Sequence, residues 1–338
     1  MGIKEVISVD EREKILEIKN LKKYFTIKGA AFKGKSSQVK AVDDISFDLY
    51  RGETLGIVGE SGSGKSTLGR TILRLLEPTE GEIIFEGTNL EKLSLRKLDD
   101  YRKNMQMIFQ DPYSSLNPRM RVGKLISEPL AVRKILNKAD QSKKVLDLIG
   151  KVGLPKESLT KFPHEFSGGQ RQRIGIARAL SLNPQLIIAD EPVSALDVSV
   201  QSQVLNLMMD LQDEFKLTYL FISHDLSVVK HISDRVGVMY LGKLVEIGPK
   251  KDIYNNPLHP YTQALLSAIP VADFGSKREI IQLKGEPPSP SDPPPGCAFH
   301  TRCSHAFDRC KIERPELIRQ KDGKSVACHL YSEQPISI

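Results

Sequence analysis

The chain has no long apolar run, and it has no cysteine before residue 297. Its longest apolar stretches cover residues 186–189 and 217–222, far short of the roughly 20 residues that a membrane-spanning helix needs. The first residues, MGIKEVISVDEREKILEI, carry acids and bases throughout, so no secretory signal is predicted. If the protein serves a membrane process, we expect the path through the lipid to belong to a partner.

Composition fits a folded protein and leaves the partner open. The 338 residues are 40% hydrophobic and 27% charged, which suffices for a full-sized core and more than one substructure. A formal net charge of +7 fits a nucleic acid, an anionic membrane surface or a phosphate-rich ligand equally well. Because the lysines and arginines are scattered along the chain, charge alone does not choose among these.

Strand and helix patterns alternate along the sequence, with a loop rich in Gly and Lys expected over residues 29–38. Helical periodicity is seen over residues 65–76 and 201–215. The segments with strand patterns are residues 14–20, 45–49, 54–58, 185–189 and 217–223. A parallel α/β sheet is the simplest architecture that accommodates this order.

Residues 59–67 read GESGSGKST and match the phosphate-loop pattern G-x-x-x-x-G-K-[ST] between a predicted strand and a predicted helix. Glycines let the backbone wrap around phosphate oxygens, so that N–H groups and the helix N-terminus face negative charge. We expect Lys65 to reach the β- and γ-phosphates of ATP and the Ser66 hydroxyl to bind Mg²⁺. A glycine-rich turn with an exposed lysine is the alternative. The expected nucleotide contacts are Gly59, Glu60, Ser61, Gly62, Ser63, Gly64, Lys65, Ser66 and Thr67.

Asp190 and Glu191 follow the apolar segment LIIA. Ligands of α/β proteins bind where such strands end. Asp190 can hold Mg²⁺, usually through water, and Glu191 can orient or deprotonate the water that attacks ATP. An acidic pair can also simply cap the next helix, but together with the phosphate loop the pair favours catalysis.

Residues 166–170 read FSGGQ and precede the helical segment RQRIGIARAL. This segment resembles the signature of the ATP-binding cassette ATPases, although Leu usually stands where this chain has Phe166. The other family motifs lie in the expected order along the chain. Gln110 comes before the signature, after an apolar strand; SALD at residues 194–197 and His224, which follows LTYLFIS, come after it. The resemblance covers about residues 14–255.

By this resemblance, Gln110 contacts the metal and senses the attached membrane protein, His224 bonds the γ-phosphate and fixes catalytic geometry, and Asp197 works at the subunit interface. Family spacing favours Phe25 over Tyr24 as the aromatic side chain that stacks on adenine, although either ring could belong to the core.

The resemblance also implies a dimer. In the family, two ATP molecules lie between two subunits, and each nucleotide meets the phosphate loop of one chain and the signature of the other. ATP closes this pair and hydrolysis opens it. The residues that would contact the partner's nucleotide are Ser167, Gly168, Gly169 and Gln170.

The implied fold is a P-loop α/β cassette with a RecA-like core, an antiparallel β subdomain and an inserted helical subdomain. We place the nucleotide-binding domain at residues 1–255 and the helical subdomain at about 96–182, where residues 142–152 carry one apolar face. A small cysteine-containing extension follows at 256–338. Within it, residues 285–296 are too proline-rich for a helix or a central strand.

Three details resemble the oligopeptide and dipeptide importers in particular: QDPYSSLNP at residues 110–118, NPLHPYT at residues 256–262, and the cysteine tail. They imply an ATPase that powers peptide import as a peripheral subunit on the cytoplasmic face of the membrane. Its partners would be a second homologous ATPase, two permeases and an extracytoplasmic peptide-binding protein, with no nucleic acid. A nickel-type importer ATPase of the same branch and a soluble cassette ATPase remain the alternatives.

The tail contains Cys297, Cys303, Cys310 and Cys328. Disulfides are rare in a reducing cytosol, and the spacing lacks the C-x-x-C pair that is usual in zinc ribbons. Four such thiolates suit an iron–sulfur cluster at least as well. Because some members of the similar branch hold a [4Fe–4S] cluster in a matching tail, this cluster is the leading expectation, with zinc and unligated cysteines as alternatives. A bound metal would mainly stabilise the small tail.

Overall fold

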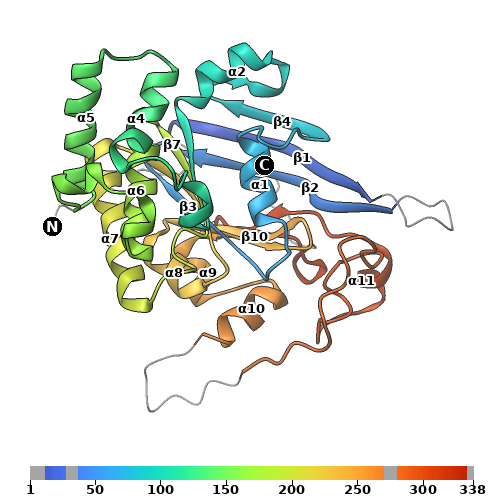
Figure 1. The fold of residues 1–338 in the computed structure, drawn as a ribbon. Helices are drawn as coiled ribbons and strands as arrows, with labels where there is room; N and C mark the ends of the chain where they lie inside the picture. Colours follow the sequence, from blue (N-terminus) through green and yellow to red (C-terminus); the bar gives the residue numbers. More distant parts are fainter. Residues whose placement is uncertain (1–11, 28–36, 270–279, 333–338) are drawn as a thin grey trace, which may run out of the picture. The chain divides into compact units, whose positions relative to one another are not determined.

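The computed structural model describes residues 12–27, 37–269 and 280–332 (Figure 1). Two compact units divide these residues. The first unit contains residues 50–53 and 92–222, together with residues 12 and 13. The second contains the described residues of 14–49, 54–91 and 223–332.

The first unit is built around three parallel strands in the order β8, β7, β6. Every residue of β7 and β8 is buried, which explains their continuous apolar sequences, because strands of a parallel sheet are covered on both faces. The elements of this unit are α2 (Leu95–Arg102), β6 (Met105–Ile108), α3 (Pro112–Ser115), α4 (Val122–Val132), α5 (Lys138–Lys151), α6 (Gly168–Leu180), β7 (Leu186–Asp190), α7 (Val198–Phe215) and β8 (Thr218–Ile222), with short 3₁₀ turns at Lys156–Thr160 and Pro163–Glu165.

The predicted helical insertion is largely helical. Helix α5 buries Val145, Leu148 and Ile149 on one face, as expected, and the Asn137 side chain caps its start by accepting the N–H of Asp140. However, β6 lies inside the predicted range 96–182 and pairs with β7. The range therefore contains a strand of the core sheet as well as the helices α3, α4, α5 and α6 and all but the first residue of α2.

The second unit contains an antiparallel sheet in the order β2, β1, β4, β5, and a further run of strands in the order β11, β12, β10, β9, β3. In the second run β3 and β9 are parallel, and the other neighbours are antiparallel. Its elements are β1 (Lys14–Ile27), β2 (Ser37–Tyr50), β3 (Thr54–Val58), α1 (Lys65–Ile72), β4 (Glu80–Phe85), β5 (Thr88–Asn89), a 3₁₀ turn at Leu90–Lys92, α8 (Leu226–Ile232), β9 (Arg235–Tyr240), β10 (Lys243–Pro249), α9 (Lys250–Asn255), α10 (Pro260–Ser267), α11 (Asp308–Ile312), β11 (Ile318–Arg319), β12 (Ser325–Val326) and a 3₁₀ turn at His329–Tyr331.

Several boundaries differ from those predicted. β1 and β2 are both longer than the predicted strands at 14–20 and 45–49. The predicted loop at 29–38 lies mostly outside the described residues, and its last two residues already belong to β2. Helix α1 ends at Ile72 rather than at residue 76, because Arg74 adopts a left-handed backbone with φ 48°. Residues 285–296 form neither helix nor strand, as predicted.

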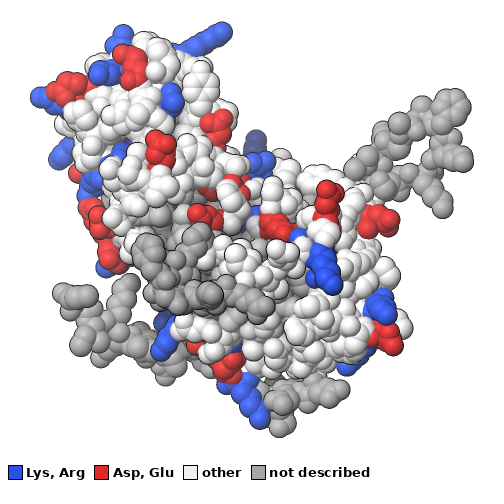
Figure 2. Space-filling view, turned by 90° about the horizontal axis from the view of Figure 1, so that it is seen from below, with Lys and Arg blue, Asp and Glu red and all other residues white. Residues whose placement is uncertain are grey.

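Charged side chains of both signs occur together on the surface that Figure 2 draws. On the face drawn in Figure 2, lysines and arginines lie interspersed with aspartates and glutamates. The net positive charge is therefore not gathered into one field on that face. In the part of the chain that the structure describes, no helix combines the length and the apolar character needed to cross a bilayer.

Candidate functional site

The phosphate loop connects the fully buried strand β3 to the start of α1 at Lys65. Gly64 has φ +100°, and a Cβ built there would lie 1.9 Å from the carbonyl oxygen of Ala41. A Cβ on Gly59 would lie 2.0 Å from the carbonyl oxygen of Met239. Both positions exclude any side chain, so the two motif glycines are required by packing as well as by backbone conformation.

Lys65 is buried, with 5% of its surface exposed, and its side chain lies across the loop. Its Nζ donates to the carbonyl oxygens of Gly59 at 2.7 Å and Glu60 at 3.0 Å, and contacts the hydroxyl of Ser63 at 3.4 Å. The ammonium group thus lies among the backbone groups of the motif. Ser66 and Thr67 follow in the first turn of α1 and are partly exposed.

The acidic pair lies at the end of β7. Asp190 is completely buried, and Glu191 follows with a left-handed backbone at φ 48°, a conformation that is uncommon for residues other than glycine and often marks functional sites. The Glu191 N–H donates to the carbonyl oxygen of Ile222 at 2.9 Å. The Gln110 amide Nε2 donates to the Glu191 carboxylate at 2.8 Å. The structure thus brings together two residues that lie 81 positions apart in the sequence, and the amide orients the carboxylate.

The signature segment forms the start of α6. Ser167 caps the helix by accepting the N–H of Gln170 at 3.3 Å, and the Gln170 side chain accepts the N–H of Ser167 at 3.0 Å. This is a capping box, a motif that stabilises the first turn of a helix. A Cβ on Gly169 would lie 2.3 Å from Cγ1 of Val200 in α7. The helix start therefore packs tightly on α7, while Ser167 stays exposed.

The two aromatic candidates for adenine stacking lie side by side in β1 but differ in environment. The Tyr24 hydroxyl donates to Asp43, and Asp43 also pairs with Lys243 at 3.4 Å and Arg314 at 2.9 Å. Phe25 has 37% of its surface exposed. The ring of Phe25 is therefore the more accessible of the two.

Asp197 and His224 are exposed residues at the starts of helices. Asp197 occupies the N-cap position of α7. His224 lies between β8 and Asp225, and the Asp225 side chain caps α8 by accepting the N–H groups of Ser227 and Val228. Both predicted residues therefore lie on the surface of their own unit.

The four cysteines of the tail line a single small cavity. The Cys297 N–H donates to the carbonyl oxygen of Cys310 at 2.8 Å. Burial raises the pKa of the Cys297 and Cys328 thiols to about 11, so a bound metal would have to displace their protons. Among the described residues, no group of three or more His, Cys, Asp or Glu side chains is arranged to hold a single metal ion. Convergence of the thiols is therefore observed, whereas a metal site is not.

Two residues that contact the phosphate loop were missed by the sequence predictions. Tyr261 accepts the N–H of Glu60 at 2.9 Å, and Arg302 pairs with the Glu60 carboxylate at 2.8 Å. Tyr261 lies within the segment NPLHPYT, which was noted only as a mark of kinship. No local pattern distinguishes Arg302 from the other arginines of the tail.

Comparison with known proteins agrees with this architecture. A model described as ABC transporter matches residues 42–194, and one described as Oligopeptide/dipeptide transporter, C-terminal region, matches residues 245–310. The chain is 60% identical to the oligopeptide transport ATP-binding protein AppF of Bacillus subtilis, over 95% of this chain and 98% of that protein. It is 53% identical to the dipeptide transport ATP-binding protein DppF of Escherichia coli, over 94% of each chain.

Solved structures confirm the expected cassette fold. An ATP-binding cassette solved as a dimer in a post-hydrolysis state with ADP and phosphate matches with a TM-score of 0.62 and 28% identity, over 70% of this chain and 98% of that one. A cassette from Clostridium perfringens, part of the transporter complex cbiONQ, matches with the same score and identity, over 72% of this chain and 92% of that one. The chain therefore belongs to the ABC ATPases of the oligopeptide and dipeptide transporter branch, which bind and hydrolyse ATP.

Proposed function

We propose that this chain powers the import of oligopeptides or dipeptides by closing on ATP with a partner ATPase. Its high identity to peptide transport ATP-binding proteins along almost its whole length carries this proposal. A nickel-type importer and a soluble cassette ATPase are not favoured, because AppF and DppF, which match almost the whole chain, are peptide transport proteins.

The loop at residues 59–67 would bind the phosphates of ATP. Lys65 would neutralise the β- and γ-phosphates, and the N–H groups at the start of α1 would donate to phosphate oxygens. The adenine ring would stack on Phe25, which the exposed position of that side chain supports. These assignments place the two ends of the nucleotide on residues of the second unit.

Mg²⁺ fits the donor types available, because Ser66, Asp190 and Gln110 all supply oxygen ligands, which this ion prefers. When bound, it would neutralise charge on the phosphates.

Hydrolysis needs a group that positions water. Glu191 would accept a hydrogen bond or the proton from the attacking water, and the amide of Gln110 holds that carboxylate at 2.8 Å. His224 would bond the γ-phosphate. The left-handed backbone of Glu191 supports this role, since strain of this kind is retained where the surrounding structure fixes a functional group.

The signature would act on the nucleotide held by the partner. Ser167, Gly168, Gly169 and Gln170 would present the N-terminus of α6 to the partner's γ-phosphate, and Asp197 would contribute at the interface. We place the working dimer on the cytoplasmic face of the membrane, peripheral to two permeases that receive peptides from an extracytoplasmic binding protein.

Glu191→Gln tests the proposed cycle of dimer closure and ATP hydrolysis. With its partner ATPase, ATP and Mg²⁺, the variant should form a stable closed dimer in analytical ultracentrifugation while ATP turnover is nearly abolished. Lys65→Ala should lose nucleotide affinity instead. In proteoliposomes with the permeases and the binding protein, uptake of labelled peptide should stop in both variants. A chain that stays monomeric as Glu191→Gln under these conditions, or that hydrolyses ATP normally, contradicts the proposal.

For the tail, we propose a [4Fe–4S] cluster held by Cys297, Cys303, Cys310 and Cys328. The convergence of the four thiols on one cavity supports it, and a four-iron cluster spaces its cysteines more widely than a single ion does. Anaerobic purification followed by iron and sulfide analysis and visible absorption tests it. About four irons and four sulfides per chain are expected, and a Cys303→Ser variant should lose them. Stoichiometric zinc, or thiols without metal, would contradict the cluster.

A further inference from the structure

Arg302, in the cysteine tail, makes a two-point contact with the phosphate loop. Its Nη1 lies 2.8 Å from one carboxylate oxygen of Glu60, and its Nη2 lies 3.0 Å from the other. Only 6% of the arginine side chain and 26% of the glutamate side chain are exposed. Such a bidentate pair fixes orientation as well as charge. The hydrogen bonds to Glu60 raise the pKa of Arg302 further above its ordinary value, so the guanidinium is always charged.

Tyr261 holds the backbone of Glu60. The Tyr261 hydroxyl accepts the Glu60 N–H at 2.9 Å, and the tyrosine is completely buried. Its ring packs against Tyr240 at 4.7 Å and Phe299 at 5.3 Å between ring centroids. Backbone and side chain of Glu60 are therefore both held by residues that follow the last strand of the cassette.

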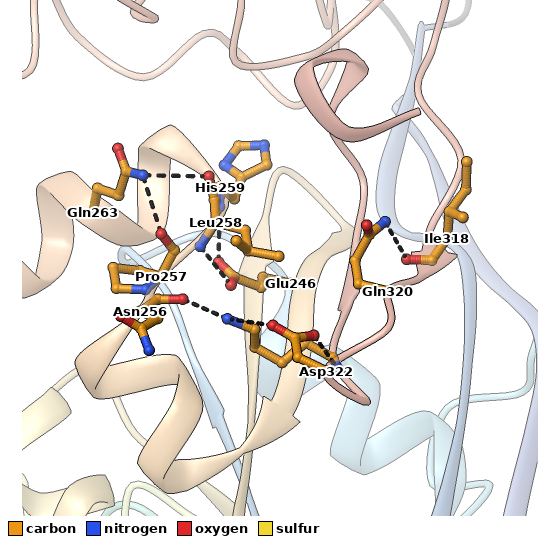
Figure 3. Close-up of polar contacts among 10 residues, drawn as sticks. Glu246, Asn256, Pro257, Leu258, His259, Gln263, Ile318, Gln320 and Asp322 are labelled. Atoms are coloured by element: carbon orange, nitrogen blue, oxygen red, sulfur yellow. Dashed lines mark hydrogen bonds and ion pairs between the residues drawn. The ribbon is translucent and has the colours of Figure 1, made fainter. Parts of the chain in front are cut away.

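A buried hydrogen-bond network holds Tyr261 in place. Figure 3 shows the buried Glu246 carboxylate facing the start of α10, where it accepts the N–H groups of Leu258 at 2.8 Å and His259 at 3.0 Å. His259 Nδ1 in turn accepts the Tyr261 N–H at 3.0 Å and caps α10. The Lys324 ammonium donates to the carbonyl oxygen of Asn256. Satisfied buried networks of this kind specify one geometry, so the position of the Tyr261 hydroxyl is well defined.

Arg302 is positioned by the fold of the tail. Its N–H donates to the carbonyl oxygen of Phe299 at 3.0 Å in a tight turn, and its guanidinium lies 5.9 Å from the centre of the Tyr240 ring. Cys303 follows directly in the sequence. The turn that carries the second thiol therefore also carries the cation that reaches Glu60.

Glu60 lies between this support and the lysine of the loop. The Lys65 Nζ donates to the Glu60 carbonyl oxygen at 3.0 Å. A carboxylate in a loop that receives phosphates repels them unless its charge is balanced. Arg302 supplies that balance from the side chain, while Tyr261 fixes the backbone that faces Lys65.

We propose that Arg302 is a positioning residue for the phosphate loop, acting through Glu60, and that the cysteine-bearing tail is thereby part of the nucleotide site. Arg302 balances the charge of Glu60 and holds the loop in the shape that receives ATP. This inference rests on the proposed role of residues 59–67 in phosphate binding.

Arg302→Met in the full chain tests the proposal. The equilibrium dissociation constant for a fluorescent ATP analogue, checked by competition with ATP, should rise about tenfold, a typical coupling between linked sites. The KM of the ATPase should rise similarly, and kcat should change by less than about twofold, because the residue acts on binding rather than on the chemical step. Arg309→Met is the matched control, since Arg309 is an exposed tail arginine that pairs with Glu313, and it should leave the dissociation constant unchanged.

A second substitution, Glu60→Gln, distinguishes an effect of Arg302 that acts through Glu60 from a general loss of structure. In a Glu60→Gln background, Arg302→Met should raise the dissociation constant by less than about twofold, because the partner charge is already gone. Arg302→Lys keeps the charge without the two-point contact and should show an intermediate rise, and it serves as the test if Arg302→Met does not fold. An unchanged dissociation constant in the arginine variants, or an equal loss in both backgrounds, overturns the proposal.

Lys65→Ala distinguishes the proposed role of the phosphate loop from the proposed role of Arg302. Normal nucleotide affinity in Lys65→Ala would remove the role of the loop itself, and the role of Arg302 with it. Lost affinity in Lys65→Ala combined with normal affinity in Arg302→Met would refute only the role of Arg302.

Discussion

We expect His259 to make the stability of the α10 region depend on pH. The side chain is 1% exposed, its Nδ1 accepts the Tyr261 N–H, and its ring packs against Phe299 at 5.7 Å. An imidazole nitrogen that accepts a hydrogen bond carries no proton. Burial lowers the pKa of His259 from 6.5 to about 3. The folded region therefore holds this histidine in its neutral form across the physiological range.

The sign and size of the effect follow from linkage. Between pH 6.5 and pH 3 the opened chain binds a proton that the folded chain does not, so the free energy of opening falls as the pH falls. Each pH unit below 6.5 costs about 1.4 kcal/mol. At about pH 5 the loss is therefore about 2 kcal/mol, which corresponds to a roughly thirtyfold larger open population.

Hydrogen exchange of the α10 backbone, read by mass spectrometry and corrected for intrinsic rates, measures this opening at pH 7.5 and pH 5. His259→Asn is the matched variant, because asparagine also caps helices well and does not titrate. The wild-type chain should lose about 2 kcal/mol more protection than the variant between the two pH values. Equal losses in the two proteins would show that His259 does not carry the proton linkage and would refute the reasoning.

Three further predictions concern substitutions in the nucleotide site. Gly64→Ala should weaken nucleotide binding more than about tenfold, because the new Cβ meets a backbone carbonyl and the left-handed φ is strained. Titration with a fluorescent ATP analogue measures the affinity, and an unchanged affinity would contradict the tight packing of the loop. Gly169→Ala should lower kcat about tenfold while the isolated chain keeps its affinity, since the signature serves the partner's nucleotide; a loss of affinity in the monomer would point to a role in the same chain. Phe25→Ala should lower adenine nucleotide affinity about two- to tenfold, as loss of a stacking contact does, whereas Tyr24→Phe should change it less; the reverse order would assign the platform to Tyr24.

Local patterns predicted the parts of the site that are continuous in sequence. The phosphate loop could be read because strand, glycines and helix follow one another within residues 54–72, and each has its own local signal. The signature helix was found because residues 166–170 resemble a family motif that is continuous in sequence, and the structure adds the capping box of Ser167 and Gln170 at its start. Kinship assigned Gln110 to the metal, and its hydrogen bond to Glu191 was not predicted; the geometry of the sheet, which aligns β6 with β7, accounts for this contact.

Contacts between distant residues could not be read from periodicity. Glu60 and Arg302 lie 242 positions apart, and Glu60 and Tyr261 lie 201 apart. Nothing in the neighbouring sequence of an arginine says which carboxylate it will meet. The strand β6 was expected only as the apolar strand before Gln110, and it gave no periodic signal of its own because it has only four residues. The end of α1 was misplaced because Arg74 adopts a backbone conformation that its residue type does not announce.

The short strand β12 has a consequence for handling the protein. It pairs with β10 at Glu246 and Ile247, and the Ala327 N–H donates to the Val245 carbonyl oxygen at 2.8 Å. A chain shortened to the cassette would leave these backbone groups on an open sheet edge, which other chains can extend by pairing. Truncations that remove residues 324–327 should therefore be prone to aggregate even when the ATPase core is intact, and a soluble fragment should retain them.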